Sequence, residues 1–277
     1  MTRKPRAKAD PLEGEIELTL HPGAFVPDRA CFSFVADLDG VAAKIAKLTA
    51  ADPARAISLY ETFLAGCYEK AEELDDSSGS FGQFIGELFC GWIEARQAAG
   101  ADPEETATRL LAWMDDDPYG FCHYIEKNAA SVFSKAGLAA FEKQIRARFD
   151  AAASAKPAPE GAFRDRHEYL RRRWGEVLRT LYLEQKNAAA YVALAEETGP
   201  TAQDCRNVAT LLASRRKPGE ALTWVERGLD LDKKTPHGSM AGYDLGKLKR
   251  DLLTRLGRGD EALEAAWAEY REHPSTY

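Results

Sequence analysis

The stretch Glu220-Ala221-Leu222-Thr223-Trp224 returns near the C-terminus, with small changes, as Glu261-Ala262-Leu263-Glu264-Ala265. Each copy follows a leucine pair and then a short basic turn that contains Gly or Pro. The leucine pairs are Leu211-Leu212 and Leu252-Leu253, and the turns are Arg215-Arg216-Lys217-Pro218-Gly219 and Gly257-Arg258-Gly259-Asp260. The offset of about 41 residues is the length of one two-helix unit in an α-solenoid. Because such a unit buries its apolar face only against its neighbours, the repeat predicts the architecture of the C-terminal half.

Helix-start signals extend this helical pattern toward the N-terminus. Asp52-Pro53 and Asp102-Pro103 each place a capping aspartate before a proline at the first helical position, and Thr201 is predicted to cap a later helix. Ser80, with Gln83 three residues later, predicts a capping box. The predicted fold class is therefore all-α: an α-α superhelix of tetratricopeptide-like antiparallel helix pairs, with at most one short N-terminal strand. The tetratricopeptide consensus itself is not satisfied.

Composition divides the chain into three segments. Residues 1–13 are polar, basic and Pro-containing, which predicts a disordered tail. Residues 14–155 form a predicted N-terminal helical block, in which the alternation over Glu15–Leu20 indicates either a short strand or a loop. Residues 156–277 carry the predicted C-terminal helical repeats. The Ala- and Pro-rich stretch at 151–160 is either a linker or a loop between helices, and one continuous solenoid is the alternative organisation.

The overall composition is that of an ordinary globular protein. The chain has 277 residues, of which 45% are hydrophobic and 29% are charged, and this length accommodates one or two domains. The formal net charge of -7 disfavours nonspecific nucleic-acid binding by the chain as a whole, because phosphate contacts require a basic surface. A local basic groove remains compatible with this charge.

The cysteines and the apolar runs bear on the compartment. The five cysteines are dispersed, without a CxxC, and are odd in number: Cys31, Cys67, Cys90, Cys122 and Cys205. This usage favours a reducing compartment over a disulfide framework. The basic N-terminus is followed by no apolar run typical of a signal peptide, and no stretch of about 18 apolar residues occurs. The sequence predicts a cytoplasmic protein without a membrane partner.

No pattern in the sequence predicts catalysis, a cofactor or a bound metal. The acidic turn Glu72–Gly79 lacks the ligand spacing of a calcium loop and is interpreted as a helix stop, and Asp115–Asp117 as a solvated turn with a capping aspartate. The neighbours Cys122 and His123 point about 100° apart on a helix, so they do not form a nucleophile–base pair. No metalloprotease, nucleophile-elbow, Walker or dinucleotide-binding motif is present.

The best candidate for a binding surface is a basic helix predicted over about 162–185. Its six arginines are Arg164, Arg166, Arg171, Arg172, Arg173 and Arg179, with Tyr169 and Trp174 among them. Arginines beside aromatic rings suit phosphates and stacked bases. Asp165, Glu168 and Glu176 dilute this charge, so the simpler interpretation is a solvated or partner-facing surface with helical ion pairs. Such a surface would prefer an acidic partner.

Several segments also resemble a known family. They are Arg55-Ala56-Ile57, Asp75–Gly79, Phe25–Asp39, Arg216–Leu222 with Trp224 to Leu229, Gly259–Leu263 with Trp267, and the terminal His273–Tyr277. From Pro53 onward the chain resembles an uncharacterised bacterial helical-domain family, similar to the helical region that follows the zinc finger in SWIM-type proteins. The finger's closely spaced cysteine pair and Cys-x-His are absent here, so its zinc and its nucleic-acid role are not implied. The resemblance implies a helical scaffold without an assigned activity. Pro274-Ser275 resembles the start of a further helix, which suggests a truncated chain.

Three functional hypotheses follow from these patterns. The first is a scaffold for protein–protein interaction without catalytic activity, because helical repeats present extended binding surfaces to peptides or proteins. The second is a nucleic-acid-associated protein that binds through the Arg164–Arg179 surface, and it predicts binding that weakens steeply with salt. The third is an enzyme with a dispersed site, which would require a strongly shifted carboxylate in a cleft.

Overall fold

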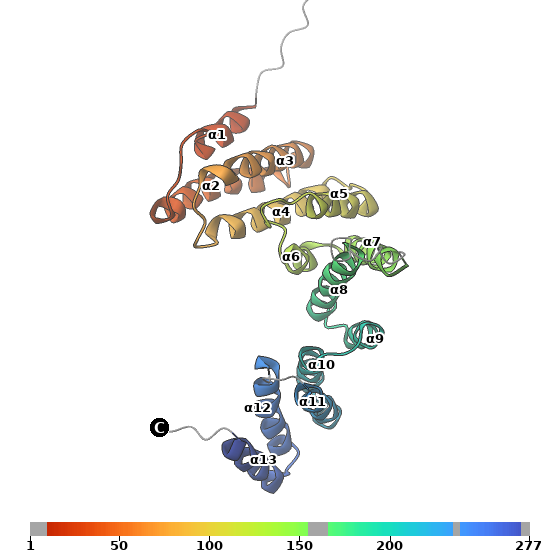
Figure 1. Cartoon of the computed structure of the whole chain (residues 1–277). Coiled ribbons are helices and arrows are strands. Elements are labelled where there is room, and N and C mark those ends of the chain that lie inside the picture. Colours follow the sequence, from red (N-terminus) through yellow and green to blue (C-terminus); the bar gives the residue numbers. More distant parts are fainter. Residues whose placement is uncertain (1–9, 155–165, 235–238, 273–277) are drawn as a thin grey trace, which may run out of the picture. The chain divides into compact units, whose positions relative to one another are not determined.

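The computed structural model describes residues 10–154, 166–234 and 239–272, and this part of the chain is helical throughout, without a β-sheet (Figure 1). The all-α helical-repeat fold is thereby confirmed. The helices are α1 (Pro11–Leu20), α2 (Asp28–Leu48), α3 (Pro53–Lys70), α4 (Ser80–Ala98), α5 (Pro103–Asp115), α6 (Ile125–Val132), α7 (Lys135–Ser154), α8 (Arg166–Glu184), α9 (Ala188–Thr198), α10 (Ala202–Ser214), α11 (Pro218–Asp232), α12 (Met240–Arg255) and α13 (Gly259–Glu272). None of these helices combines the length and the apolar character that crossing a membrane requires.

The chain divides into two compact units, Met1–Val177 and Leu178–Tyr277, and the boundary in the sequence falls within α8. The predicted division lies earlier, at the Ala- and Pro-rich stretch, most of which falls outside the described residues. The predicted tail at 1–13 also lies mostly outside them, but Pro11–Glu13 already belong to α1. The terminal segment that suggested a truncated chain lies outside the described residues as well.

In the N-terminal unit the helix packing is continuous from α1 to α7. Helix α3 packs against α1, α2 and α4, while α4 also contacts α2, α5 and α6, and α5 packs against α7. The core between them is rich in fully buried aromatic side chains: Phe63, Phe81, Phe84, Phe89, Trp92, Phe141 and Phe149. Phe63 and Phe84 meet edge to face with ring centroids 5.4 Å apart, which joins α3 to α4.

The alternating stretch near the N-terminus is a helix, so the predicted strand or loop is wrong. Asp10 accepts a hydrogen bond from the backbone N–H of Leu12, and Pro11 occupies the first helical turn. Ile16 and Leu20, four residues apart, are buried, whereas Leu18 is 75% exposed. The alternating stretch therefore contains an apolar pair at the helical spacing of four residues. An apolar run this short does not distinguish the strand period of 2 from the helix period of 3.6.

Three of the predicted helix caps are confirmed and one is wrong. Asp52, Asp102 and Thr201 each accept a backbone N–H at the start of their helix, and Thr201 forms a capping box with Asp204. Helix α4 has no capping box at Ser80; instead, the Asp76 carboxylate accepts hydrogen bonds from the N–H groups of Phe81 and Gly82, at 3.0 and 2.9 Å. Asp76 takes this position because the turn brings it back over the first turn of α4.

The C-terminal unit contains a repeated hairpin turn. Lys186, Arg216 and Gly257 each adopt the left-handed conformation two residues after the last residue of a helix. In each turn the next N–H donates to a carbonyl five residues earlier: Asn187 to Tyr182 at 2.7 Å, Lys217 to Leu212 at 3.0 Å, and Arg258 to Leu253 at 2.9 Å. The helix pairs α10–α11 and α12–α13 are the two predicted repeats. The turn between α8 and α9 is a third copy, which the sequence pattern did not reveal.

Candidate functional site

The arginines predicted to form a binding surface are used in different ways by the fold. Arg164 lies outside the described residues. Arg179 belongs to the C-terminal unit, where its guanidinium pairs with Asp204 at 2.8 Å and donates to Thr198 Oγ1 at 2.5 Å. Asp204 also accepts the hydroxyl of Tyr191 at 2.8 Å. Arg179 therefore connects α8, α9 and α10.

In the N-terminal unit, two more of these arginines pack on aromatic rings. Arg171 lies 5.5 Å from the ring centroid of Phe149, and Arg173 lies 5.0 Å from that of Trp174. Arg173 also donates to the backbone carbonyl of Met114. Arg166 and Arg172 are exposed. The structure thus leaves Arg166 and Arg172 as the exposed part of the predicted surface in this unit, and partner binding there stays a prediction.

Acidic residues of both predicted turns accept hydrogen bonds from neighbouring residues, and one of these bonds comes from the backbone of Cys122. Glu72 accepts the hydroxyl of Tyr119 at 3.0 Å, and Asp117 accepts the N–H groups of Phe121 and Cys122 at 3.0 and 2.7 Å. Burial raises the pKa of the Cys122 thiol to about 12, so this thiol is protonated at neutral pH. Within the described residues, no group of three or more His, Cys, Asp or Glu side chains could hold a metal ion.

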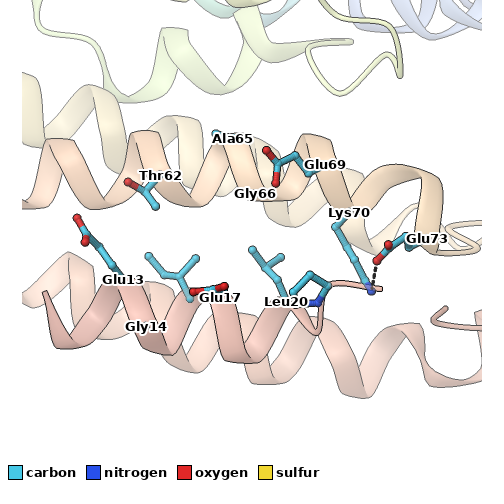
Figure 2. A pocket seen from close by; sticks show the side chains of 12 residues that line it. Glu13, Gly14, Glu17, Leu20, Thr62, Ala65, Gly66, Glu69, Lys70 and Glu73 are labelled. Atoms are coloured by element: carbon cyan, nitrogen blue, oxygen red, sulfur yellow. Dashed lines mark hydrogen bonds and ion pairs between the residues drawn. The ribbon is translucent and has the colours of Figure 1, made fainter. Parts of the chain in front are cut away.

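A groove with a volume of about 750 Å³ lies between α1 and α3 (Figure 2). We call it the α1–α3 groove. Its lining includes the apolar Ile16, Leu20 and Ala65, and the acidic Glu13, Glu17, Glu69 and Glu73; Gly14, Pro22, Thr62, Gly66 and Lys70 complete it. Figure 2 shows that the glutamates come from both helices, with Glu13 and Glu17 on α1 and Glu69 on α3.

Two features place α1 against α3. Asp10, at the start of α1, accepts two hydrogen bonds from the guanidinium of Arg55 on α3, at 2.6 and 2.8 Å. Gly66 allows the helices to approach closely, because a Cβ atom at this position would lie 2.6 Å from Leu20 Cδ1. The floor of the groove is therefore built by a glycine on one helix and a leucine on the other.

A buried lysine closes one end of the groove. Lys70 donates to the carbonyls of His21, at 2.9 Å, and Ala24, and to Glu73 Oε2 at 3.0 Å. The hydrogen bond from Lys70 and that from the Gly23 N–H lower the pKa of Glu73. The charge of Lys70 is thus compensated inside the protein, and the carboxylates of Glu13, Glu17 and Glu69 dominate the field of the groove.

A second cavity of about 540 Å³ lies on the other side of α3, which we call the α3–α5 pocket. It is lined by Tyr68, Trp113 and Tyr119, by the carboxylates Glu69 and Asp116, and by Ala65, Ala112 and Pro118. Ala65 and Glu69 line both cavities. The two cavities are therefore adjacent, and the exposed side of α3 separates them.

Sequence reasoning missed both cavities. The acidic pair Glu13 and Glu17 has helical spacing, but the sequence pattern predicts a disordered tail at Glu13 and a strand or loop at Glu17, which does not place the two side chains on one helix. The signal that could have found the groove is Asp10-Pro11, the same helix-start pattern that correctly predicted α3 and α5.

Together, the fold and these cavities define an all-α helical-repeat protein with an acidic surface groove and an adjoining aromatic pocket. The chain belongs to a family of unknown function, DUF6880, whose model matches residues 22–274. No curated protein and no solved structure matches the chain significantly.

Proposed function

We propose that the protein is a protein–protein interaction scaffold without catalytic activity, and that its α1–α3 groove binds a basic amphipathic helix of a partner protein. The observation that carries this proposal is the composition of the groove. Ala65 and Pro22, which are both exposed, supply apolar surface, and Glu13 and Glu17 supply uncompensated negative charge along the edge of the groove.

The shape of the groove supports a helix as the ligand. Its lining follows α1 from Glu13 to Leu20 and continues to Pro22, and a groove that runs along a helix is suited to a second helix laid beside it. A bound helix would place apolar residues at spacings of three and four against Pro22 and Ala65, and Lys or Arg residues beside the glutamates. Complementary charge would then set the orientation and speed the association.

The sequence-based predictions of the binding partner, the location and the type of superhelix also enter this proposal. We retain an acidic partner at Arg166 and Arg172 as the second candidate, because both side chains are exposed. Nucleic acid is the alternative ligand of the same surface. The cysteines, all free thiols, support the predicted cytoplasmic location. The tetratricopeptide-like superhelix and the similarity to SWIM-type proteins also stay predictions, and the groove proposal does not depend on them.

The test is a selection of displayed random peptides on the wild-type protein, followed by binding measurements on a variant with a blocked groove. Gly14→Phe places a ring in the α1–α3 groove, because a Cβ atom at Gly14 meets no atom within 4 Å. We expect selected peptides that are basic and amphipathic, and we expect Gly14→Phe to weaken their binding at least about tenfold, the equivalent of roughly 1.4 kcal/mol.

The matched control is Gly40→Phe. Gly40 is also a helical glycine with open space around its Cβ position, but it lies on α2 and does not line the groove. Equal loss of binding in both variants, or selected peptides without a basic amphipathic pattern, would refute the groove proposal. Peptides that are acidic and lose binding on combined Arg166→Glu and Arg172→Glu substitution would support the second candidate instead.

A further inference from the structure

The α3–α5 pocket contains a group of adjoining aromatic rings. The ring centroid of Tyr68 lies 5.3 Å from that of Trp113 and 6.3 Å from that of Tyr119. Trp113 is also held edge-on by Phe89, at 5.6 Å. The Tyr68 hydroxyl donates to Asp117 at 3.2 Å, so this ring is fixed at both ends. The rings are preorganised for stacking, because their positions are set by contacts within the protein.

The charges in this pocket all have one sign. Of the residues that line it, Glu69 and Asp116 are charged, and both carboxylates are exposed. The faces of aromatic rings also carry negative electrostatic potential, so rings and carboxylates attract the same kind of ligand, an organic cation. A phosphate or an acidic side chain would be repelled by both.

Among organic cations, the arginine guanidinium fits both kinds of group. It is planar and stacks on tyrosine and tryptophan, and its N–H groups donate to carboxylates. A quaternary ammonium could use the rings but has no N–H for Glu69 or Asp116. The presence of carboxylates beside the rings therefore favours arginine.

We propose that the α3–α5 pocket binds the guanidinium group of an arginine side chain. The proposed function enters only as the source of this arginine: Ala65 and Glu69 line both cavities, so an arginine beside the helix bound in the α1–α3 groove has a direct path across α3. An arginine of the basic partner would thus serve as an anchor residue in the α3–α5 pocket.

The test uses protein labelled with 5-fluorotryptophan and ¹⁹F NMR, with the Trp113 signal assigned from a Trp113→Phe variant. The probes are N-acetyl-arginine methylamide and its uncharged isostere N-acetyl-citrulline methylamide. We expect a saturable shift of the Trp113 signal with the arginine compound. We expect the citrulline compound to bind at least about tenfold more weakly, because its uncharged urea forms neither an ion pair with the carboxylates nor a cation–π contact with the rings.

Adjacent carboxylates supply a matched pair of variants. Asp116 lines the pocket, whereas Asp115 pairs with Arg148 at 3.0 Å outside it. We expect Asp116→Asn to weaken binding of the arginine compound about three- to tenfold and Asp115→Asn to leave it unchanged. Absence of a saturable shift, equal binding of the citrulline compound, or tighter binding of N-acetyl-trimethyllysine methylamide would each overturn the assignment.

This test is separate from that of the groove. Gly14 does not line the α3–α5 pocket, so Gly14→Phe is expected to leave the arginine-induced shift unchanged. A shift that survives in this variant while the selected peptides lose binding supports both proposals. If Gly14→Phe does not weaken peptide binding but the arginine-induced shift is observed, the groove proposal is rejected and the pocket proposal stands. If Gly14→Phe weakens peptide binding but no shift is observed, the pocket proposal is rejected and the groove proposal stands.

Discussion

Removal of the charge on Asp204 is expected to destabilise the C-terminal unit strongly. The Asp204 side chain is buried and accepts hydrogen bonds from Arg179 at 2.8 Å, from the Tyr191 hydroxyl at 2.8 Å, and from the Thr201 N–H and hydroxyl at 3.0 and 2.8 Å. Asp204→Asn leaves the Arg179 guanidinium without its counter-charge. It also replaces one carboxylate oxygen by an amide nitrogen, which cannot accept a hydrogen bond.

The expected cost follows from the burial of the two partners. Removal of one partner from a buried ion pair costs about 3–5 kcal/mol. The side chain of Arg179 retains 20% exposure, so water compensates part of the loss and the lower limit of about 3 kcal/mol applies. By the equivalence of about 1.4 kcal/mol per factor of ten, this raises the opening equilibrium of α9 and α10 by more than about a hundredfold.

The assay is native-state hydrogen exchange, read by mass spectrometry on peptides from α9 and α10. Asp230→Asn is the matched control, because Asp230 lies in the same unit but is exposed and pairs with the exposed Lys233 at 3.4 Å. Acceleration of less than about fivefold in Asp204→Asn, or acceleration equal to that of Asp230→Asn, would show that the buried network does not stabilise this unit as argued.

Three further predictions rest on other contacts. Asp76→Ala should lower the free energy of unfolding by about 1–2 kcal/mol through loss of the α4 cap, and Ser80→Ala should lower it much less; equal effects in chemical denaturation would contradict the cap assignment. Gly66→Ala should cost about 1–3 kcal/mol in the same assay because its Cβ would meet Leu20, and a Leu20→Ala background should reduce that cost; an unchanged cost would count against the contact. Burial by itself would raise the pKa of Asp204, but hydrogen bonds from Thr201 and Arg179 outweigh it and lower this pKa. The network's stabilisation is therefore complete above the unfolded-state pKa of about 3.9 and is lost as the pH falls through the lower folded-state pKa. The protection factors of α9 and α10, taken relative to the intrinsic exchange rate at each pH, should fall over that acid range in wild type more than in Asp204→Asn, and parallel pH profiles would refute this.

The cap predictions succeeded where the chemistry is local. Asp52 accepts an N–H from three residues ahead and Asp102 from two residues ahead, so a segment of three or four residues contains the whole interaction. Asp76 accepts N–H groups from residues five and six positions ahead, across a turn. The Ser80–Gln83 pattern spans fewer residues, and it predicts a capping box that the structure does not form. The repeat was predictable because both copies have a leucine pair, a basic turn with Gly or Pro, and the tripeptide Glu-Ala-Leu in the same order.

Local chemistry was thus sufficient for the all-α class, several helix starts and the repeated hairpins, because caps and periodicity act within about two helical turns. Burial, pairing and cavities depended on contacts between residues far apart in the chain. Leu222 is 5% exposed while its repeat partner Leu263 is 60% exposed, although both stand in an EAL triplet. Arg172 is exposed and Arg179 is bound to Asp204, although both lie on one basic helix. The groove exists because Gly66 meets Leu20 across more than forty positions, and only packing of α1 on α3 brings them together.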